Sequence, residues 1–411
     1  MNLVLAGGGI DDSDKEYYGT IIKLAGGNHS RIGIITAASV PERDDPDRGT
    51  PAASNSRENG EFYLKLFTQH GAKAAEWIPI DIDTISNNKD EKLIARVGKM
   101  TGFFFGGGDQ TRLVQCLMND DASDTPLLSA IRRRFENGAV VSGTSAGTAI
   151  QSGIPMISGG VSYYGLRDGI YKDGAPHPHG DDDLTYSPQG GFAFFNQGLL
   201  DTHYVQRGRQ GRSIRLAWER GVRLIFGVDA GATMVIRNAN TPDAEMTVLS
   251  DLGVTVIDLS RARAGAGKEF SISNVLVHYL THGDRMKIGK KEFQIADYKK
   301  PLAGREEILS VKPSPDIFSC PEHVVGTSET RICEKEFMRV TTGLFKSANH
   351  VVYGTTWEKN PRFQVKMEKS GKYGSAGYEG IRKKESVISY LNMLLEIKPL
   401  NDDFQNSRIR E

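Results

Sequence analysis

The pentapeptide Gly-Thr-Ser-Ala-Gly at residues 143–147 has the G-x-S-x-G pattern of a nucleophile elbow. The apolar residues 139–141 before it predict a strand, and residues 147–150 can open a helix. A sharp turn between them would present the Ser145 hydroxyl to a cleft, and the N–H of Ala146 could donate to a developing oxyanion. A tight glycine turn with a capping serine is the alternative.

A second glycine-rich turn follows three phenylalanines at residues 103–105. Glycine N–H groups can approach a substrate carbonyl closely, so Gly107 and Gly108 are candidates for the second oxyanion donor. A phosphate-binding turn or a purely structural turn is the alternative. No lysine follows as in the P-loop pattern, and Thr111 breaks the dinucleotide-binding pattern G-x-G-x-x-G.

The segment 201–212 combines one histidine with three arginines. His203 could take the proton of the Ser145 hydroxyl and then deliver it to a leaving amine. Planar guanidinium groups suit carboxylate recognition, and the three arginines are Arg207, Arg209 and Arg212. A structural histidine and a solvated arginine-rich start of a helix are the alternatives.

These segments lie where short apolar runs alternate with amphipathic stretches. Strands are predicted at residues 3–5, 31–36, 76–80, 102–105, 139–141 and 223–226, and helices at 62–70, 91–100 and 127–137. This alternation predicts an α/β fold, with a mostly parallel sheet flanked by helices. The glycine clusters after Ala6, Phe105 and Val141 should therefore share the ligand-binding edge of the sheet.

The character of the sequence changes twice after the predicted elbow. Residues 152–196 are rich in Gly, Pro, Tyr, His and Asp, which predicts a long loop or insertion over the active edge. From residue 245 onward β-like runs dominate, and the apolar segment 387–395 could be a strand or a helix. We expect a catalytic domain over residues 1–244 and a mixed α+β extension over 245–411 packed on it.

Composition excludes several classes of protein. The 411 residues contain 51 Lys+Arg and 51 Asp+Glu, so no net charge draws the chain to nucleic acid or to an anionic membrane. No apolar run approaches the roughly 18–20 residues of a membrane span. Three cysteines are too few for a disulfide scaffold. Unpaired thiols are expected, and a Cys320–Cys333 bridge is conceivable in a secreted chain.

Taken together, the three segments resemble the cyanophycinases, a serine peptidase family related to dipeptidase E. That family has Gly-Gly-Asp-Gln after a strand, a Gly-Thr-Ser-Ala-Gly elbow, and Asp-Gln-His-Phe followed by Arg-x-Arg-x-x-Arg. The matching positions here are residues 107–110, 143–147 and 201–212, and the resemblance extends over about residues 1–290. Its members cut cyanophycin, a poly-aspartate carrying arginine on each side-chain carboxyl, into β-aspartyl-arginine dipeptides.

The resemblance implies a serine exopeptidase that works through an acyl-enzyme and needs no cofactor. Ser145 would be the nucleophile and His203 the base. The substrate-binding residues would be Gln110, Asp201, Thr202, Arg207, Arg209 and Arg212. Thr202 stands where the family has Gln, which could alter the binding of the terminal dipeptide. The family also suggests a homodimer, and its longer members suggest a secreted chain without its signal, with a cytoplasmic chain as the alternative.

One departure concerns the acid that orients the histidine. The family carries Asp-Glu after a later strand, whereas this chain has Asp229 followed by Ala230. Asp229 is our candidate, with Asp168 or an acid from residues 181–183 as alternatives. A relative that only binds β-aspartyl ligands in the arginine cleft therefore stays open, and the elbow alone would also fit an esterase. His177 and His179 near those acids offer metal ligands, but a solvated polar loop is favoured and no metal is expected.

Overall fold

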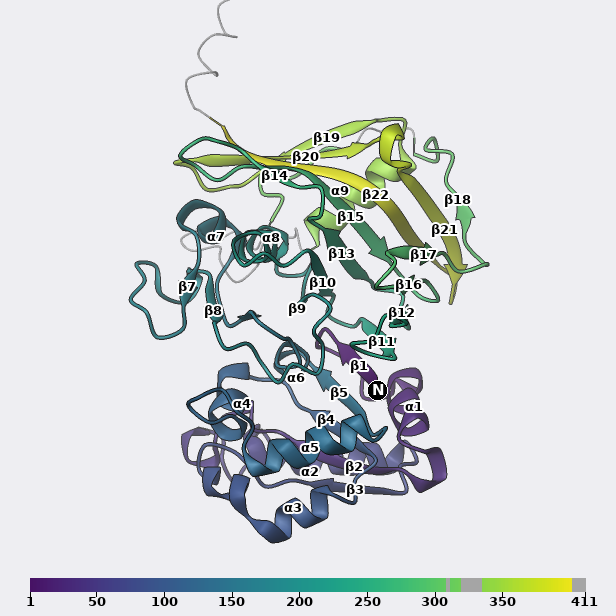
Figure 1. Ribbon diagram of the computed structural model, residues 1–411. Coiled ribbons are helices and arrows are strands. Elements are labelled where there is room, and N and C mark those ends of the chain that lie inside the picture. The colour runs from purple at the N-terminus through teal and green to yellow at the C-terminus, as the bar shows by residue number, and fades with distance from the viewer. Residues whose placement is uncertain (308–310, 319–334, 401–411) are drawn as a thin grey trace, which may run out of the picture.

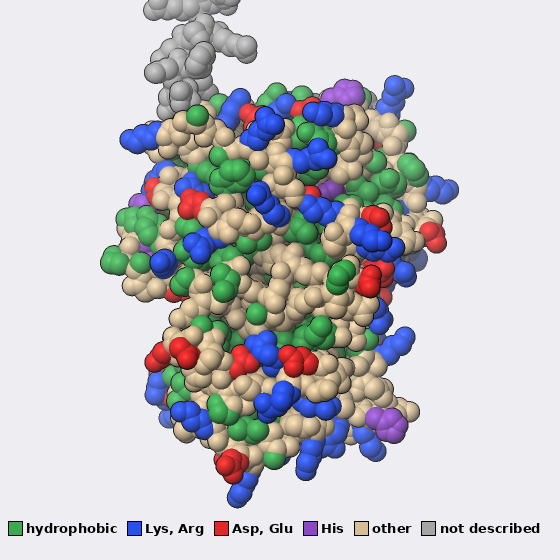
Figure 2. All heavy atoms as spheres, in the orientation of Figure 1, with side chains coloured by type: hydrophobic (Ala, Val, Ile, Leu, Met, Phe, Trp, Pro, Cys, Tyr) green, Lys and Arg blue, Asp and Glu red, His purple; other side chains and the backbone are tan. Residues whose placement is uncertain are grey.

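The computed structural model describes residues 1–307, 311–318 and 335–400 (Figure 1). Cys320 and Cys333 lie outside these ranges, while Cys116 is buried and unpaired. None of the helices within the described ranges is long and apolar enough to cross a lipid bilayer. On the face seen in Figure 2, acidic and basic side chains are interspersed over both halves of the molecule.

The first large sheet is built around the predicted parallel strands. Its order is β17-β16-β12-β11-β1-β5-β4-β2-β3, and the five strands from β1 to β3 run parallel. The α/β class predicted from the sequence is confirmed. The bounds are β1 Asn2–Ala6, β2 Arg31–Ile35, β3 Ala74–Trp77, β4 Gly102–Phe105, β5 Val140–Thr144, β11 Thr233–Arg237, β12 Glu245–Val248, β16 Arg285–Lys287 and β17 Glu292–Gln294.

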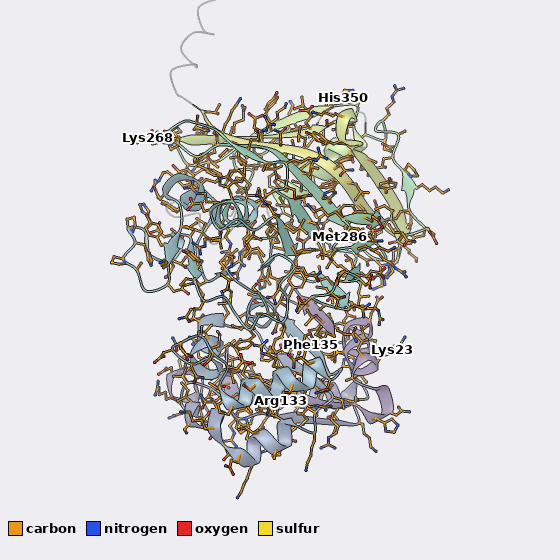
Figure 3. All side chains as sticks on the ribbon, in the orientation of Figure 1. Lys23, Arg133, Phe135, Lys268, Met286 and His350 are labelled. Carbon is orange, nitrogen blue, oxygen red and sulfur yellow. The ribbon has the colours of Figure 1, made fainter. Side chains whose placement is uncertain are left out.

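Helices cover both faces of this parallel region, as its uninterrupted apolar strands require. Tyr18 of α1 and Phe67 of α2 pack on one face with Phe104, whereas Ile131 of α5 packs on the other with Phe103. On α5, Phe135 is buried in this core and Arg133 is exposed (Figure 3). The bounds are α1 Lys15–Leu24, α2 Ser56–Gln69, α3 Glu91–Val97, α4 Gln110–Leu117, α5 Pro126–Glu136 and α6 Ala146–Ala149.

The second large sheet has the order β18-β21-β22-β15-β13-β10-β9, with β14 beside β15 and β20 joining β19 to β22. Residues 387–395 are strand, because they lie inside the long β22. Helices α7, α8 and α9 pack in its core. The bounds are β9 Leu199–Thr202, β10 Leu224–Val228, β13 Val254–Asp258, β14 Arg263–Ala264, β15 Ile272–Leu280, β18 Lys300–Pro301, β19 Val351–Thr355, β20 Arg362–Lys369, β21 Ala376–Arg382, β22 Glu385–Leu400, α7 Ser162–Asp168, α8 Gln210–Glu219 and α9 Glu336–Lys346.

The segment 152–196 is more ordered than the long loop expected from its sequence. It contains α7 and a small sheet of β6 (Met156–Ile157), β8 (Thr185–Ser187) and β7 (Tyr171–Lys172). Strands of two or three residues are too short for a period-2 pattern to be visible in the sequence. The weak periodicity of the segment therefore gave no sign of these elements.

The expected division at residues 244 and 245 does not follow the sheets. Strands β9 and β10, from the expected catalytic domain, belong to the second sheet, and β12, β16 and β17, from the expected extension, belong to the first. The two parts of the chain therefore share both sheets. A division into two units at this boundary stays a prediction.

Candidate active site

Ser145 occupies the turn between β5 and α6, with φ 53° and ψ −118°. A positive φ is costly for a serine and is found where the surrounding structure enforces it. Flanking glycines make the turn possible. A Cβ atom on Gly143 would lie 2.1 Å from the carbonyl oxygen of Gly147, and one on Gly147 would lie 2.0 Å from that of Phe105. The geometry is that of a nucleophile elbow.

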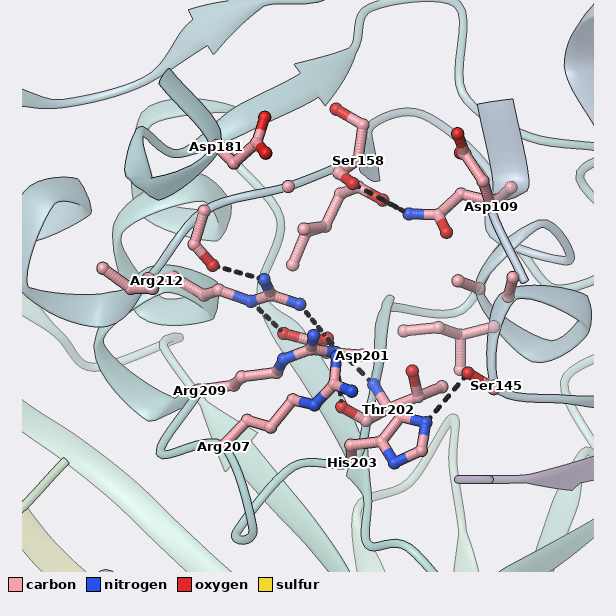
Figure 4. A pocket seen from close by; sticks show the side chains of 18 of the residues that line it. Asp109, Ser145, Ser158, Asp181, Asp201, Thr202, His203, Arg207, Arg209 and Arg212 are labelled. Carbon is pink, nitrogen blue, oxygen red and sulfur yellow. Dashed lines mark hydrogen bonds and ion pairs between the residues drawn. The ribbon is translucent and has the colours of Figure 1, made fainter. Parts of the chain in front are cut away.

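His203 follows β9, and its Nε2 atom lies 2.9 Å from the Ser145 hydroxyl oxygen (Figure 4). The backbone N–H of His203 donates to the carbonyl of Gly7 at 3.0 Å. The ring lies against Gly8, where a Cβ atom would be only 2.3 Å from Cε1. The glycine cluster after β1 thus makes room for the imidazole, a role that the sequence analysis did not assign to it.

The imidazole of His203 is held in its neutral form. Burial, together with the charges of Arg207 and Arg209, lowers the pKa of His203 to about 4. At pH 7 the ring is therefore unprotonated and can accept the proton of the Ser145 hydroxyl.

The glycine-rich turn after β4 lies beside the nucleophile. A Cβ atom on Gly107 would lie 3.4 Å from the Cβ of Ser145. Gly108 has a φ of +134°, and a Cβ there would lie 2.1 Å from the carbonyl oxygen of Ala38. With Ala146 next to Ser145, the structure brings together all three residues expected to donate to an oxyanion. Their role as donors stays a prediction.

Ser145 and His203 open into a cavity of about 330 Å³. Both basic and acidic side chains line it, and Figure 4 shows Asp109 across the cavity from the arginines and Asp181 above Arg212. The basic residues are Arg207, Arg209 and Arg212, and the acidic residues are Asp109, Asp181 and Asp201. Every substrate-binding residue expected from the sequence lines this cavity, namely Gln110, Asp201, Thr202 and the three arginines.

Asp201 lies beneath the arginines and organises them. Its carboxylate accepts hydrogen bonds from Arg212 at 2.6 and 2.9 Å and from Arg209 at 3.2 Å. Although burial by itself raises the pKa of this carboxyl, Arg212 and Arg209 hold the pKa of Asp201 below its ordinary value. Guanidinium groups of its own chain already surround Asp201, so its contacts do not favour the binding of a substrate guanidinium.

The amide of Gln110 fixes the opposite wall of the cavity. Its Nε2 atom donates to the carbonyl oxygens of Ile157 and Ser158, at 2.9 and 3.1 Å. This ties the start of α4 to the small sheet formed by segment 152–196. Gln110 therefore shapes the site in addition to lining it.

Asp229 does not fill the position expected of an acid that orients His203. Its carboxylate accepts from the N–H groups of Val205 and Gly253 and from the hydroxyl of Tyr279. Within the described residues, no carboxylate forms a hydrogen bond with the Nδ1 atom of His203.

The alternative acids considered for orienting His203 contact other residues or lie at the rim of the cavity. Asp168 pairs with Arg167 at 2.7 Å, and Asp183 accepts from the backbone N–H of His179. Asp181 is exposed at the rim of the cavity. Ala230, at the position where the resembled family has Glu, has its backbone held by Gln206, which donates to its carbonyl and accepts from its N–H.

One group of side chains has the composition of a metal site. Ligand atoms of Asp168, His179 and Asp183 lie within 4.8 Å of one another. However, Nη2 of Arg167 contacts both His179 Nε2, at 2.5 Å, and Asp168 Oδ2, at 2.7 Å. A guanidinium thus already supplies positive charge between these two groups, so this cluster does not fit a metal ion.

The chain is similar in sequence to known peptidases. A model of Peptidase family S51 matches residues 50–156. The chain is 29% identical over 291 residues to a cyanophycinase of Trichormus variabilis, covering 69% of this chain and 84% of that protein. It is 28% identical over 294 residues to a cyanophycinase of Synechococcus elongatus, covering 69% and 78%. A crystal structure of a peptidase from an acI-B1 Actinobacterium aligns with 18% identity and a TM-score of 0.43, over 62% of this chain and 89% of that one. The sequence comparisons confirm the predicted resemblance and the assignment to the serine-type peptidases.

Proposed function

We propose that this chain, a serine-type peptidase similar to the cyanophycinases, releases β-aspartyl-arginine dipeptides from the end of cyanophycin. The observation that carries the proposal is the contact of 2.9 Å between Ser145 and His203, at a cavity with a basic wall and an acidic wall. A polymer with free carboxylates and guanidinium groups is complementary to such a cavity. The names of the relatives support the same substrate.

The contacts of the arginines suggest how substrate is divided between the two walls. Arg212 is committed to Asp201 and to the carbonyl of Gly160. Arg209 also bonds Asp201 and the carbonyl of Thr202. Arg207 and Arg209 reach further toward His203 than Arg212 does, and they would bind the carboxylates of the substrate. A free terminal carboxylate bound there would restrict cleavage to the end of the polymer.

The acidic wall would receive the substrate arginine. Asp109 lines the cavity opposite the arginines, and Asp181 lines it above Arg212 in the view of Figure 4. Because Asp201 is neutralised by its own arginines, these two carboxylates are better placed to attract a substrate guanidinium. The substrate would thus lie across the cavity, with its scissile carbonyl beside Ser145.

The chemical steps follow from the positions of the groups. His203 takes the proton of the Ser145 hydroxyl as the oxygen attacks the carbonyl, and N–H groups of the glycine turn and of Ala146 would stabilise the oxyanion. The protonated His203 then donates to the leaving amine, which leaves an acyl-enzyme on Ser145. The leaving amine belongs to the terminal dipeptide, which is released at this step. A water molecule, deprotonated by His203, then hydrolyses the acyl-enzyme, which releases the shortened polymer and restores the serine.

Incubation with cyanophycin and mass spectrometry of the soluble products tests this function. Wild type is expected to release β-aspartyl-arginine, and Ser145→Ala is expected to release none above background. Ser123→Ala, which removes an exposed hydroxyl outside the cavity, serves as the matched control and should behave as wild type. Equal release by Ser145→Ala would exclude the proposed mechanism.

A second function is a protein that binds such ligands without turnover. The lack of a carboxylate against His203 Nδ1 among the described residues favours it, because loss of the triad acid can cost several orders of magnitude in rate. Saturable binding of cyanophycin by wild type without any product would support this alternative.

A further inference from the structure

Asp229 is a fully buried carboxylate at the end of β10, beneath the loop that carries His203. Its Oδ1 atom accepts from the N–H of Val205 at 3.2 Å. Its Oδ2 atom accepts from Tyr279 at 2.7 Å and from the N–H of Gly253 at 3.3 Å. Burial raises the pKa of Asp229 to about 7, although these three hydrogen bonds favour its ionised form. The arrangement joins three segments that are distant in the sequence.

The histidine loop is fixed by three consecutive backbone N–H groups. Those of His203 and Tyr204 donate to the carbonyls of Gly7 and Val228, at 3.0 and 3.2 Å. The third, that of Val205, has the Asp229 carboxylate as its acceptor. Because His203 has a φ of 46°, its backbone conformation must be enforced by contacts of this kind. Asp229 supplies the only side chain among these three acceptors.

Tyr279 brings the second sheet into this arrangement. It lies on β15, its hydroxyl also accepts from the N–H of Gly253 at 3.0 Å, and its ring stacks on Tyr390 of β22 at 5.9 Å. Tyr390 in turn stacks on Phe345 of α9 at 4.8 Å. The stacked rings of Phe345, Tyr390 and Tyr279 therefore form an aromatic column, and the hydroxyl at its end donates to the Asp229 carboxylate.

We propose that Asp229, held by Tyr279, is a positioning residue that fixes the His203 loop through the N–H of Val205. This positioning role differs from the role expected from the sequence, in which the Asp229 carboxylate orients the imidazole of His203. The inference rests on the proposed function only in taking Ser145 and His203 as the reacting pair. It also gives the strands after residue 245 a task at the site, because Tyr279 comes from them.

Labelling of Ser145 by a serine-directed phosphonate tests the proposal without any peptide substrate, so failure of the substrate assignment does not affect it. Asp229→Asn keeps an acceptor for the N–H of Val205, and its labelling rate should fall no more than about tenfold. Asp229→Ala loses the acceptor, and its rate should fall about 100-fold, the cost of a small misplacement of a reacting group. If Asp229 were the triad acid, Asp229→Asn would lose about 10⁴-fold, and that result would overturn the proposal.

Tyr279→Phe provides a milder test should Asp229→Ala fail to fold. Its labelling rate should fall several-fold, whereas Tyr390→Phe, which removes a hydroxyl from the same aromatic column, should match wild type. Where the variant is active on substrate, kcat should fall while KM stays at the wild-type value. The lost buried hydrogen bond should lower the thermal unfolding midpoint, but the protein should remain folded at the assay temperature. Equal labelling by Tyr279→Phe and wild type would contradict the proposal, as would a loss fully explained by a lowered unfolding midpoint.

Discussion

The carboxylate of Asp201 receives two hydrogen bonds from Arg212, at 2.6 and 2.9 Å, inside a region where both side chains are almost fully buried. Because Asp201 is paired with Arg212, its carboxylate holds the arginines of the cavity in place instead of binding substrate. Arg207, Arg209 and Arg212 thus line one part of the cavity, and Asp109 lines the part across from them.

Breaking this pair should destabilise the fold. Arg212→Leu leaves Asp201 buried with only Arg209 as a cationic partner, so we expect the free energy of unfolding to fall by about 3 kcal/mol. The double variant Asp201→Leu/Arg212→Leu removes the uncompensated charge and should recover part of the loss. Urea unfolding of both variants measures this. Equal stability of the single and double variants would contradict the role of the pair.

The rate at which Ser145 is labelled should decline with falling pH only at unusually low pH. The base must be neutral, and because the pKa of His203 is lowered to about 4, labelling of Ser145 should stay constant from pH 7 to 5 and decline only near pH 4. Arg207→Gln removes a neighbouring positive charge, which raises the pKa of His203 and should move this decline to higher pH. Circular dichroism at each pH verifies folding. A decline near pH 6.5, the ordinary value for histidine, would refute the prediction.

A carboxylate introduced next to His203 should accelerate the reaction. Ala230 precedes Gly231, whose N–H donates to Gly8, and Gly8 lies against the His203 ring. Ala230→Glu would place a carboxylate near the imidazole, stabilise its protonated form, and raise kcat by about tenfold or more. Ala230→Gln has nearly the same size without the charge and serves as the control. The same kcat for both variants would show that no carboxylate can act from this position.

The glycines of the elbow should be irreplaceable for steric reasons. A Cβ atom on Gly147 would lie 2.0 Å from the carbonyl oxygen of Phe105, so Gly147→Ala should lower the free energy of unfolding by about 3 kcal/mol or more. Gly19 on α1 has no neighbour within 4 Å, and Gly19→Ala should stabilise the protein by about 0.5–1 kcal/mol. Chemical denaturation distinguishes them, and similar changes in stability for both would contradict the packing argument.

The local sequence was sufficient to predict those parts of the site that lie within a single strand, turn or helix. The elbow around Ser145, the glycine turn at Gly107 and the parallel strands leading to them follow from apolar runs and glycine positions. The role of Asp229 could not be predicted, because its partner Tyr279 is 50 residues away and lies in the second sheet. A period-2 pattern identifies a strand but not its neighbours, which is why the shared sheets across residue 245 were missed.

Identification of the modified residue after phosphonate treatment tests the central claim, that His203 activates Ser145. Mass spectrometry of digested wild type should place one adduct per chain on Ser145. His203→Ala should react at least about 100-fold more slowly, as expected for loss of a general base. An unmodified Ser145 in folded wild type, or equal labelling in His203→Ala, would contradict the account.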